Sequence, residues 1–277
     1  MRFKSRTYHL IVVVALAAGA TGCSKLAARD KLNKGVHAYK AGNTEGAVEL
    51  FKEAKQLDPN LLNARLYLAT AYASQYIPGA PSEENTRNGQ QAIAEFKDVL
   101  QADSNNLSAI DGLGSIISYM AGNPFKRELF EESKEYHQKH IQLSPNDADP
   151  YYWMGFINWT LVYRNNDDLR SEYNRDARRP IKADEPLPEK LREQFVQNNA
   201  QLIEEGIENL NKSVNLKPDY AAAFAYLNLL YRQKADLTGS TEERDQLLAQ
   251  ADRYVEQYKD IKQKELERAA SGGLPST

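Results

Sequence analysis

The chain has 277 residues, of which 42% are hydrophobic and 26% are charged, an ordinary globular composition. Its formal net charge of -3, without a dense run of lysine and arginine, argues against nucleic acid as a partner. Strand-like alternation is scarce, and glycine and proline are modest in number, so we expect an all-α fold.

The N-terminal segment is typical of a secretory signal. Arg2, Lys4 and Arg6 form a charged region without an acid, and the apolar run Leu10–Ala18 follows. That run is too short for a comfortable membrane span. Cys23 is the only cysteine and stands where cleavage would fall, so we expect no internal disulfide in the mature chain.

The residues that end this segment, Ala20-Thr21-Gly22-Cys23, resemble the bacterial lipoprotein signal, with alanine in place of the usual leucine. The resemblance implies that residues 1–22 are removed, that Cys23 carries acyl chains such as palmitate, and that residues 23–26 form a lipidated tether. Ser24 occupies a position where aspartate favours the inner membrane. It therefore implies the outer membrane, with the protein facing the periplasm. The alternative is a plain signal peptide followed by a free cysteine.

The stretch Gly35–Pro59 predicts two short amphipathic helices joined by a turn at Gly42-Asn43, with Pro59 after the second helix. One face of that second helix has a small-large-small pattern: Ala47, Phe51 and Ala54. A hairpin of this size has little apolar surface to bury, so it needs neighbouring hairpins for stability.

This unit resembles the tetratricopeptide repeat. Gly35 matches the glycine of the family's first helix, whereas Ala38 stands at its aromatic position and Tyr39 follows. The resemblance implies an all-α, right-handed superhelical array of helical hairpins with inserted loops, about five repeats within residues 27–265. The later repeats open at Leu62, Leu107, Ala148 and Tyr220.

Two insertions interrupt the predicted array. The first, near residues 77–88, contains two prolines and a glycine. The second, near residues 160–188, is long, polar and charged, and such segments are usually either functional or disordered. The sequence leaves open whether it is a lid, a site or a disordered loop. Residues 266–277 are expected to form a tail.

In this family a concave groove binds peptides or partner helices, so the resemblance implies a set of partner-binding residues. Family members that clamp acidic chaperone tails carry Lys and Asn where this chain has Leu32 and Val36, so that activity is not expected. The predicted groove residues are Tyr39, Leu66, Thr70, Asp111, Ser115, Tyr152, Phe156, Trp159, Leu229 and Arg232.

Four aromatic residues recur at helical spacing and form a stripe on one helix face: Tyr152, Phe156, Trp159 and Tyr163. Exposed in a groove, they would anchor a partner. If the insertion at residues 160–188 folds over them, they form a second core instead. The two interpretations overlap, because a lid can also act as a gate.

Other chemistry is sparse. His137 and His140 lie three residues apart on one predicted helix, but no third ligand has a compelling position, so we expect no metal site. The chain has no glycine-rich phosphate loop and no GxSxG motif. We therefore expect no cofactor and no enzymatic activity.

The leading hypothesis is a membrane-anchored scaffold that binds a protein or peptide in its groove during assembly of an envelope complex. It resembles the repeat lipoproteins that serve outer-membrane protein insertion or pilus assembly. An alternative is a module that binds envelope glycan or peptidoglycan fragments, with the aromatic stripe stacking on sugar rings. A third hypothesis is an enzyme whose site lies in the insertion at residues 160–188.

Overall fold

A computed structural model describes residues 23–271, in which all regular structure is helical apart from an isolated bridge between Gly122 and Phe125. The predicted all-α fold class is thus confirmed. The predicted signal segment, residues 1–22, lies outside the described residues, as does the end of the predicted tail. The chain forms two compact units, divided between Leu129 and Phe130. Within residues 23–271, no helix combines the length and the apolar character needed to cross a membrane.

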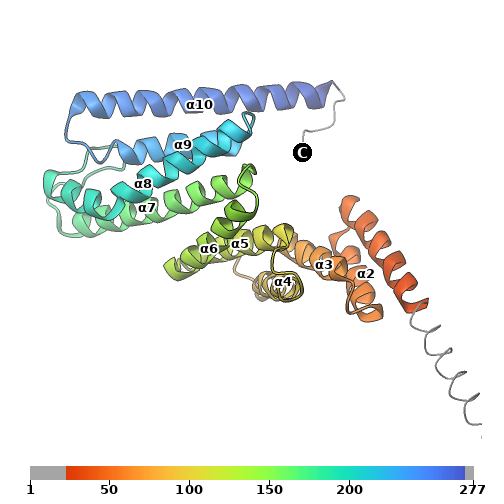
Figure 1. Cartoon of the computed structure of the whole chain (residues 1–277). Coiled ribbons are helices and arrows are strands. Elements are labelled where there is room, and N and C mark those ends of the chain that lie inside the picture. The colour runs from red at the N-terminus through yellow and green to blue at the C-terminus, as the bar shows by residue number, and fades with distance from the viewer. Residues whose placement is uncertain (1–22, 272–277) are drawn as a thin grey trace, which may run out of the picture. The chain divides into compact units, whose positions relative to one another are not determined.

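The first unit is a series of antiparallel hairpins that begins with a helix at residues 23–40. Each later helix packs on the next, and α3 also contacts α5, which is the neighbour pattern of stacked helical hairpins. Figure 1 shows these helices from red to yellow. The labelled helices are α2 (Thr44–Leu57), α3 (Leu62–Gln75), α4 (Glu83–Ala102) and α5 (Leu107–Ala121).

Small residues in this unit allow close packing of helices. A β-carbon added at Gly35 would lie 2.5 Å from the ring of Phe51 on α2, so only glycine fits at this approach. The turn between these two helices needs Gly42, whose φ is +80°. The next residue, Asn43, caps α2 by accepting a hydrogen bond from the backbone N–H of Gly46.

The insertion predicted near residues 77–88 forms a short loop, residues 76–82, and the first turns of α4. Ser82 caps α4, and Asn85 in its first turn is almost fully buried. The Asn85 side chain accepts from the N–H of Ile77 and donates to the carbonyls of Ile77 and Ala80, at 2.7–3.0 Å. One asparagine therefore fixes the loop against the helix that follows it.

In the second unit, α7, α8, α9 and α10 form two further hairpins (Figure 1). Successive helices pack on one another, and α7 also contacts α9 directly. Figure 1 shows α10 lying along α9. The helices are α6 (Arg127–Leu143), α7 (Asp149–Asp176), α8 (Glu189–Leu216), α9 (Ala221–Lys234) and α10 (Thr241–Ala270).

The insertion predicted near residues 160–188 is mostly ordered structure. Its first half continues α7 to Asp176, and its second half, residues 177–188, is a connection that we call the strap. Leu187 of the strap is only 3% exposed and joins the core formed by α7, α8 and α9. The strap is therefore part of the fold, because its apolar side chains are buried with those of the helices. Residues 266–270 of the predicted tail continue α10.

Candidate partner-binding surface

The predicted groove residues of the first unit partly converge. Thr70, Asp111 and Ser115 line one cavity of about 310 Å³ between α3 and α5, and the ring of Phe96 forms part of its wall. Tyr39 and Leu66 are half-buried elsewhere in this unit. The cavity is small, so it suits a single side chain rather than a whole partner segment.

A larger cavity of about 760 Å³, which sequence reasoning did not predict, lies where loop 76–82 meets α2 and α4. Its wall includes Lys52, whose ammonium donates to Glu49 at 2.7 Å and lies 5.9 Å from the centre of the Tyr72 ring. The hydrogen bond to Glu49 raises the pKa of Lys52. The charge of this lysine is thus matched within the protein.

In the second unit, the aromatic stripe of α7 meets tyrosines that belong to the following repeat. Tyr226 of α9 lies 5.2 Å from Phe156 and 5.1 Å from Trp159, between ring centres. Tyr152 lies 4.9 Å from Tyr220 and 5.8 Å from Tyr226. We call the combined set the aromatic surface: Tyr152, Phe156, Trp159, Tyr163, Tyr220 and Tyr226.

The aromatic surface is neither buried nor fully open. Tyr152, Phe156, Trp159, Tyr220 and Tyr226 are half-buried, whereas Tyr163 is 51% exposed. Tyr152, Trp159, Tyr220 and Tyr226 pack against the core of the unit. The stripe is therefore partly buried and partly exposed. The rings that cover part of it are Tyr220 and Tyr226, whereas the second interpretation expected residues 160–188 to cover it.

The strap is held near the far end of α7. Asn174 and Ile181 exchange two hydrogen bonds of 2.8–2.9 Å, and Arg170 donates to the carbonyls of Lys182 and Glu185. These contacts lie one turn or more beyond Tyr163, and they fix an ordered connection there.

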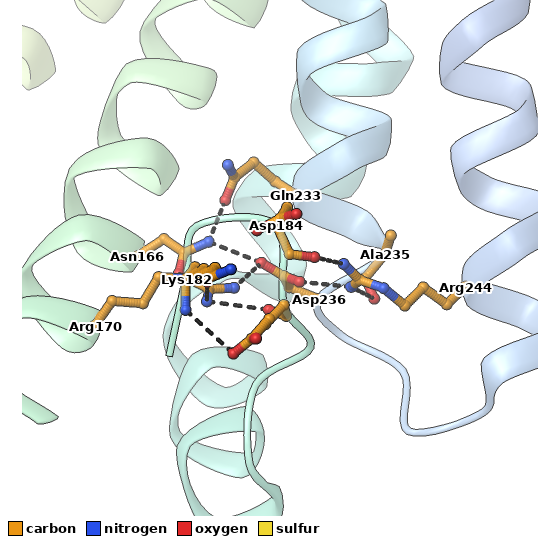
Figure 2. A network of polar contacts seen from close by, with 9 residues as sticks. Asn166, Arg170, Lys182, Asp184, Gln233, Ala235, Asp236 and Arg244 are labelled. Carbon is orange, nitrogen blue, oxygen red and sulfur yellow. Dashed lines mark hydrogen bonds and ion pairs between the residues drawn. The ribbon is translucent and has the colours of Figure 1, made fainter. Parts of the chain in front are cut away.

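A buried polar cluster stands behind the strap, and Figure 2 shows its members. Asp236, in the turn after α9, lies between two arginines: Arg170 donates to its Oδ2 at 2.8 Å and Arg244 to its Oδ1 at 2.7 Å (Figure 2). Asn166 donates to the same Oδ2 at 3.0 Å and to Gln233 at 2.7 Å. We call these five residues the Asp236 cluster.

The charged groups of the Asp236 cluster form hydrogen bonds to one another and to the backbone. Backbone carbonyls of the strap and of the α9 end accept further guanidinium N–H groups from Arg170 and Arg244. The carboxylate accepts from three side chains, so its charge and its acceptors are matched. Sequence reasoning missed the cluster. The available signal was the i, i+4 pair Asn166 and Arg170 on one helix face inside a polar run.

Two predicted groove residues of α9 have local roles. Arg232 donates to Asn228 at 2.9 Å and to Asp252 of α10 at 2.6 Å, so it links the last two helices. Leu229 is half-buried. Neither residue belongs to the aromatic surface.

The two histidines of α6 are buried. The His137 ring stacks on Trp153 with centres 5.5 Å apart, and Nε2 of His140 lies 3.3 Å from a carboxylate oxygen of Asp147. Within residues 23–271, no group of three or more histidine, cysteine or acidic residues is placed to hold a metal ion.

No protein-family model and no curated protein matches the chain. Solved structures do. MamA from Desulfovibrio magneticus RS-1 (residues 41 to the end) is 16% identical, with a TM-score of 0.54 over 86% of this chain and 96% of that one. A further crystal structure of MamA is 17% identical, with a TM-score of 0.50 over 91% of this chain and 98% of the other.

YrrB, described as a TPR protein with an unusual peptide-binding site, is 14% identical, with a TM-score of 0.48 over 88% of this chain and 91% of that one. The likeness to the two MamA structures, at 16–17% identity, shows the fold alone. The predicted tetratricopeptide-repeat fold is confirmed.

Proposed function

We propose that this chain, which has the tetratricopeptide-repeat fold, is a scaffold that binds a protein partner through the aromatic surface of α7 and α9. The observation that carries the proposal is the half-exposed set of rings at the contact between two helices. Aromatic side chains offer large contact area at low entropic cost, and they dominate the energetic centres of protein interfaces. A partner would bury more of this surface, and burial of apolar area contributes about 25 cal/mol per Å² to the free energy of binding.

The packing of the rings favours a polypeptide over a sugar. A sugar stacks on an open ring face, whereas Trp159 lies against both Tyr163 and Tyr226, at 5.4 and 5.1 Å between centres. Tyr152 likewise lies within 6.4 Å of Phe156, Tyr220 and Tyr226. The rings are thus partnered by one another, and a polypeptide with apolar side chains and a few polar groups suits such a surface.

The polar groups that contact the strap favour a binding function over catalysis. Among the charged groups that converge there, Asp236 and Arg170 are buried and Arg244 is half-buried, and both arginines bond to Asp236 and to backbone carbonyls. General acid–base work needs a group within hydrogen-bond reach of a substrate. The arginines of this cluster instead donate hydrogen bonds to backbone carbonyls of the strap.

The membrane tether remains part of the proposal on the strength of the sequence. Cys23 is exposed at the start of the described residues, followed directly by the first helix of the array. Acylation of this cysteine would place the scaffold at a membrane surface, for which we propose the periplasmic side of the outer membrane. Assembly of an envelope complex is the process that we propose it serves.

Photo-crosslinking in the native cell tests the binding surface. A photoreactive phenylalanine analogue would replace Tyr163, whose ring is already exposed. Tyr173 is the matched control, because it is a tyrosine of the same helix, 37% exposed, outside the aromatic surface. We expect a discrete adduct from position 163 and none from position 173. An adduct from position 173 alone would reject the aromatic surface as the binding site.

A further inference from the structure

The helices α7 and α9 meet along a single seam that contains both the aromatic surface and the Asp236 cluster. Asn166 follows Trp159 by seven residues, and Gln233 follows Tyr226 by seven residues. The pair Trp159–Tyr226 and the pair Asn166–Gln233 are therefore in the same register, 67 residues apart in sequence. Two helical turns, about 10.5 Å, separate the ring contact from the polar contact.

The register recurs in a second series of pairs. Phe156 contacts Tyr226, and Asn166 contacts Asp236, with 70 residues between the members of each pair. Since the offset is constant, α7 and α9 run parallel here, and the polar cluster continues the helix face that carries the rings. A change in the distance between α7 and α9 at the cluster is thus transmitted to the rings, which lie only two turns of stiff helix away.

We propose that Asn166, Arg170 and Asp236 are positioning residues for the aromatic surface, which they hold by fixing the spacing of α7 and α9. Three directional bonds join α7 to the last turn of α9 and to the turn that follows it: Asn166 to Gln233 and to Asp236, and Arg170 to Asp236, at 2.7–3.0 Å (Figure 2). Apolar ridges can slide by a fraction of a turn, whereas hydrogen bonds to a buried carboxylate tolerate little displacement.

The same carboxylate couples this spacing to the strap and to α10. Arg170 binds the strap carbonyls of Lys182 and Glu185, and Arg244 binds the carbonyl of Asp184. Opening the cluster would release all of these contacts together, because Asp236 is the only member that bonds to both arginines in the described part of the chain. In some proteins a buried ionic group selects one arrangement among those that apolar packing allows, and this is the role that the proposal gives to the Asp236 cluster.

The role of the cluster in partner binding rests on the proposed function, whereas its role in helix spacing does not. Pulsed electron paramagnetic resonance would therefore measure the spacing directly in the full chain. Spin labels would be placed at the exposed Ser171 of α7 and the half-buried Ala222 of α9, in a Cys23→Ser background. We expect one narrow distance distribution for the parent protein, and a broadened or shifted distribution for Asp236→Asn.

Two further variants separate positioning from general stability. Asp168→Asn removes an exposed carboxylate of the same helix, which pairs with Arg164 one turn away at 3.1 Å, and should leave the distribution narrow. The apolar triple variant Arg170→Met, Asp236→Leu and Arg244→Met should recover thermal stability and still show a broad distribution. An unchanged distribution in Asp236→Asn, or a narrow one in the triple variant, would overturn the proposal.

Two other readouts complete the test. The side chains of Arg178 and Lys182 are already exposed, so release of the strap should act on the backbone around them, which becomes free to enter the active site of trypsin, with cleavage roughly tenfold faster in Asp236→Asn. The adduct from a probe at position 163 should weaken in the same variant. If the parent protein gives no adduct at all, the proposed function fails, and the distance distributions still decide whether the cluster positions the helices.

Discussion

The indole ring of Trp159 on α7 lies 5.1 Å from the ring of Tyr226 on α9, and this contact joins two repeats. Because each ring is half-buried, the pair belongs both to the seam between the helices and to the surface that a partner would meet. Its contribution to stability and its contribution to binding are therefore separable by experiment.

We predict an energetic coupling between Trp159 and Tyr226. In a double-mutant cycle to alanine, the interaction term in the free energy of unfolding should be about 0.5–1.5 kcal/mol, the range for aromatic pairs beyond their buried area. Trp153, the other tryptophan, also lies in the second unit and remains as the fluorescent reporter in urea unfolding. A cycle between Trp159 and the exposed Tyr258 of α10 is the control and should show additive effects.

Gly155→Ala should destabilise the second unit. A β-carbon at this position would lie 2.4–3.0 Å from the side-chain atoms of Leu210 on α8. Overpacking costs about 1–3 kcal/mol, which the helix preference of alanine offsets by about 1 kcal/mol, so we expect a net loss of up to about 2 kcal/mol. Gly122→Ala is the control, since its β-carbon would meet nothing nearer than 3.7 Å. Equal urea midpoints for both variants would contradict the prediction.

Asn85→Ala should loosen loop 76–82 in the first unit. The variant loses three hydrogen bonds to the loop backbone and leaves buried polar groups without partners, at a cost of about 1–3 kcal/mol. Hydrogen exchange should show faster exchange at the amide of Ile77, which donates to this side chain. The exposed Asn105 provides the control substitution. Unchanged protection of the Ile77 amide would show that the loop is held by other contacts.

Much of the fold was predictable from the sequence, because the residues that define each repeat lie close together in the chain. Glycine at Gly35 and phenylalanine at Phe51 form a steric pair, and each has its place in the family pattern. The helix caps at Asn43 and Ser82 are equally local, since each side chain bonds to an amide three residues on.

The Asp236 cluster was not predictable in this way. Its members Arg170 and Asp236 are 66 residues apart, and the charges look like solvated helix faces in the sequence. Only the parallel packing of α7 and α9 brings them together. The same limit applies to Tyr226, which completes the aromatic surface from α9 although the stripe itself is visible in the sequence of α7.

Alkaline pH should destabilise the contact between α9 and α10. Burial is the main cause that raises the pKa of Tyr254, and the nearby Tyr231, 5.3 Å away between ring centres, raises it further. The folded-state pKa therefore exceeds the unfolded value of about 10. The associated stability is present below about pH 10 and is lost as pH rises through the folded pKa. Tyr254→Phe should show a shallower decline of the unfolding midpoint above about pH 10. An identical decline in both proteins would contradict this.

The affinity of the crosslinked partner for the purified chain tests the central claim most directly. Trp159→Ala should weaken binding by about 2 kcal/mol or more, roughly thirtyfold, as expected for an aromatic residue at the centre of an interface. Tyr173→Ala, on the same helix outside the aromatic surface, should leave the affinity unchanged. Equal affinity for the parent protein and Trp159→Ala, with a loss in Tyr173→Ala, would show that the partner binds elsewhere on α7.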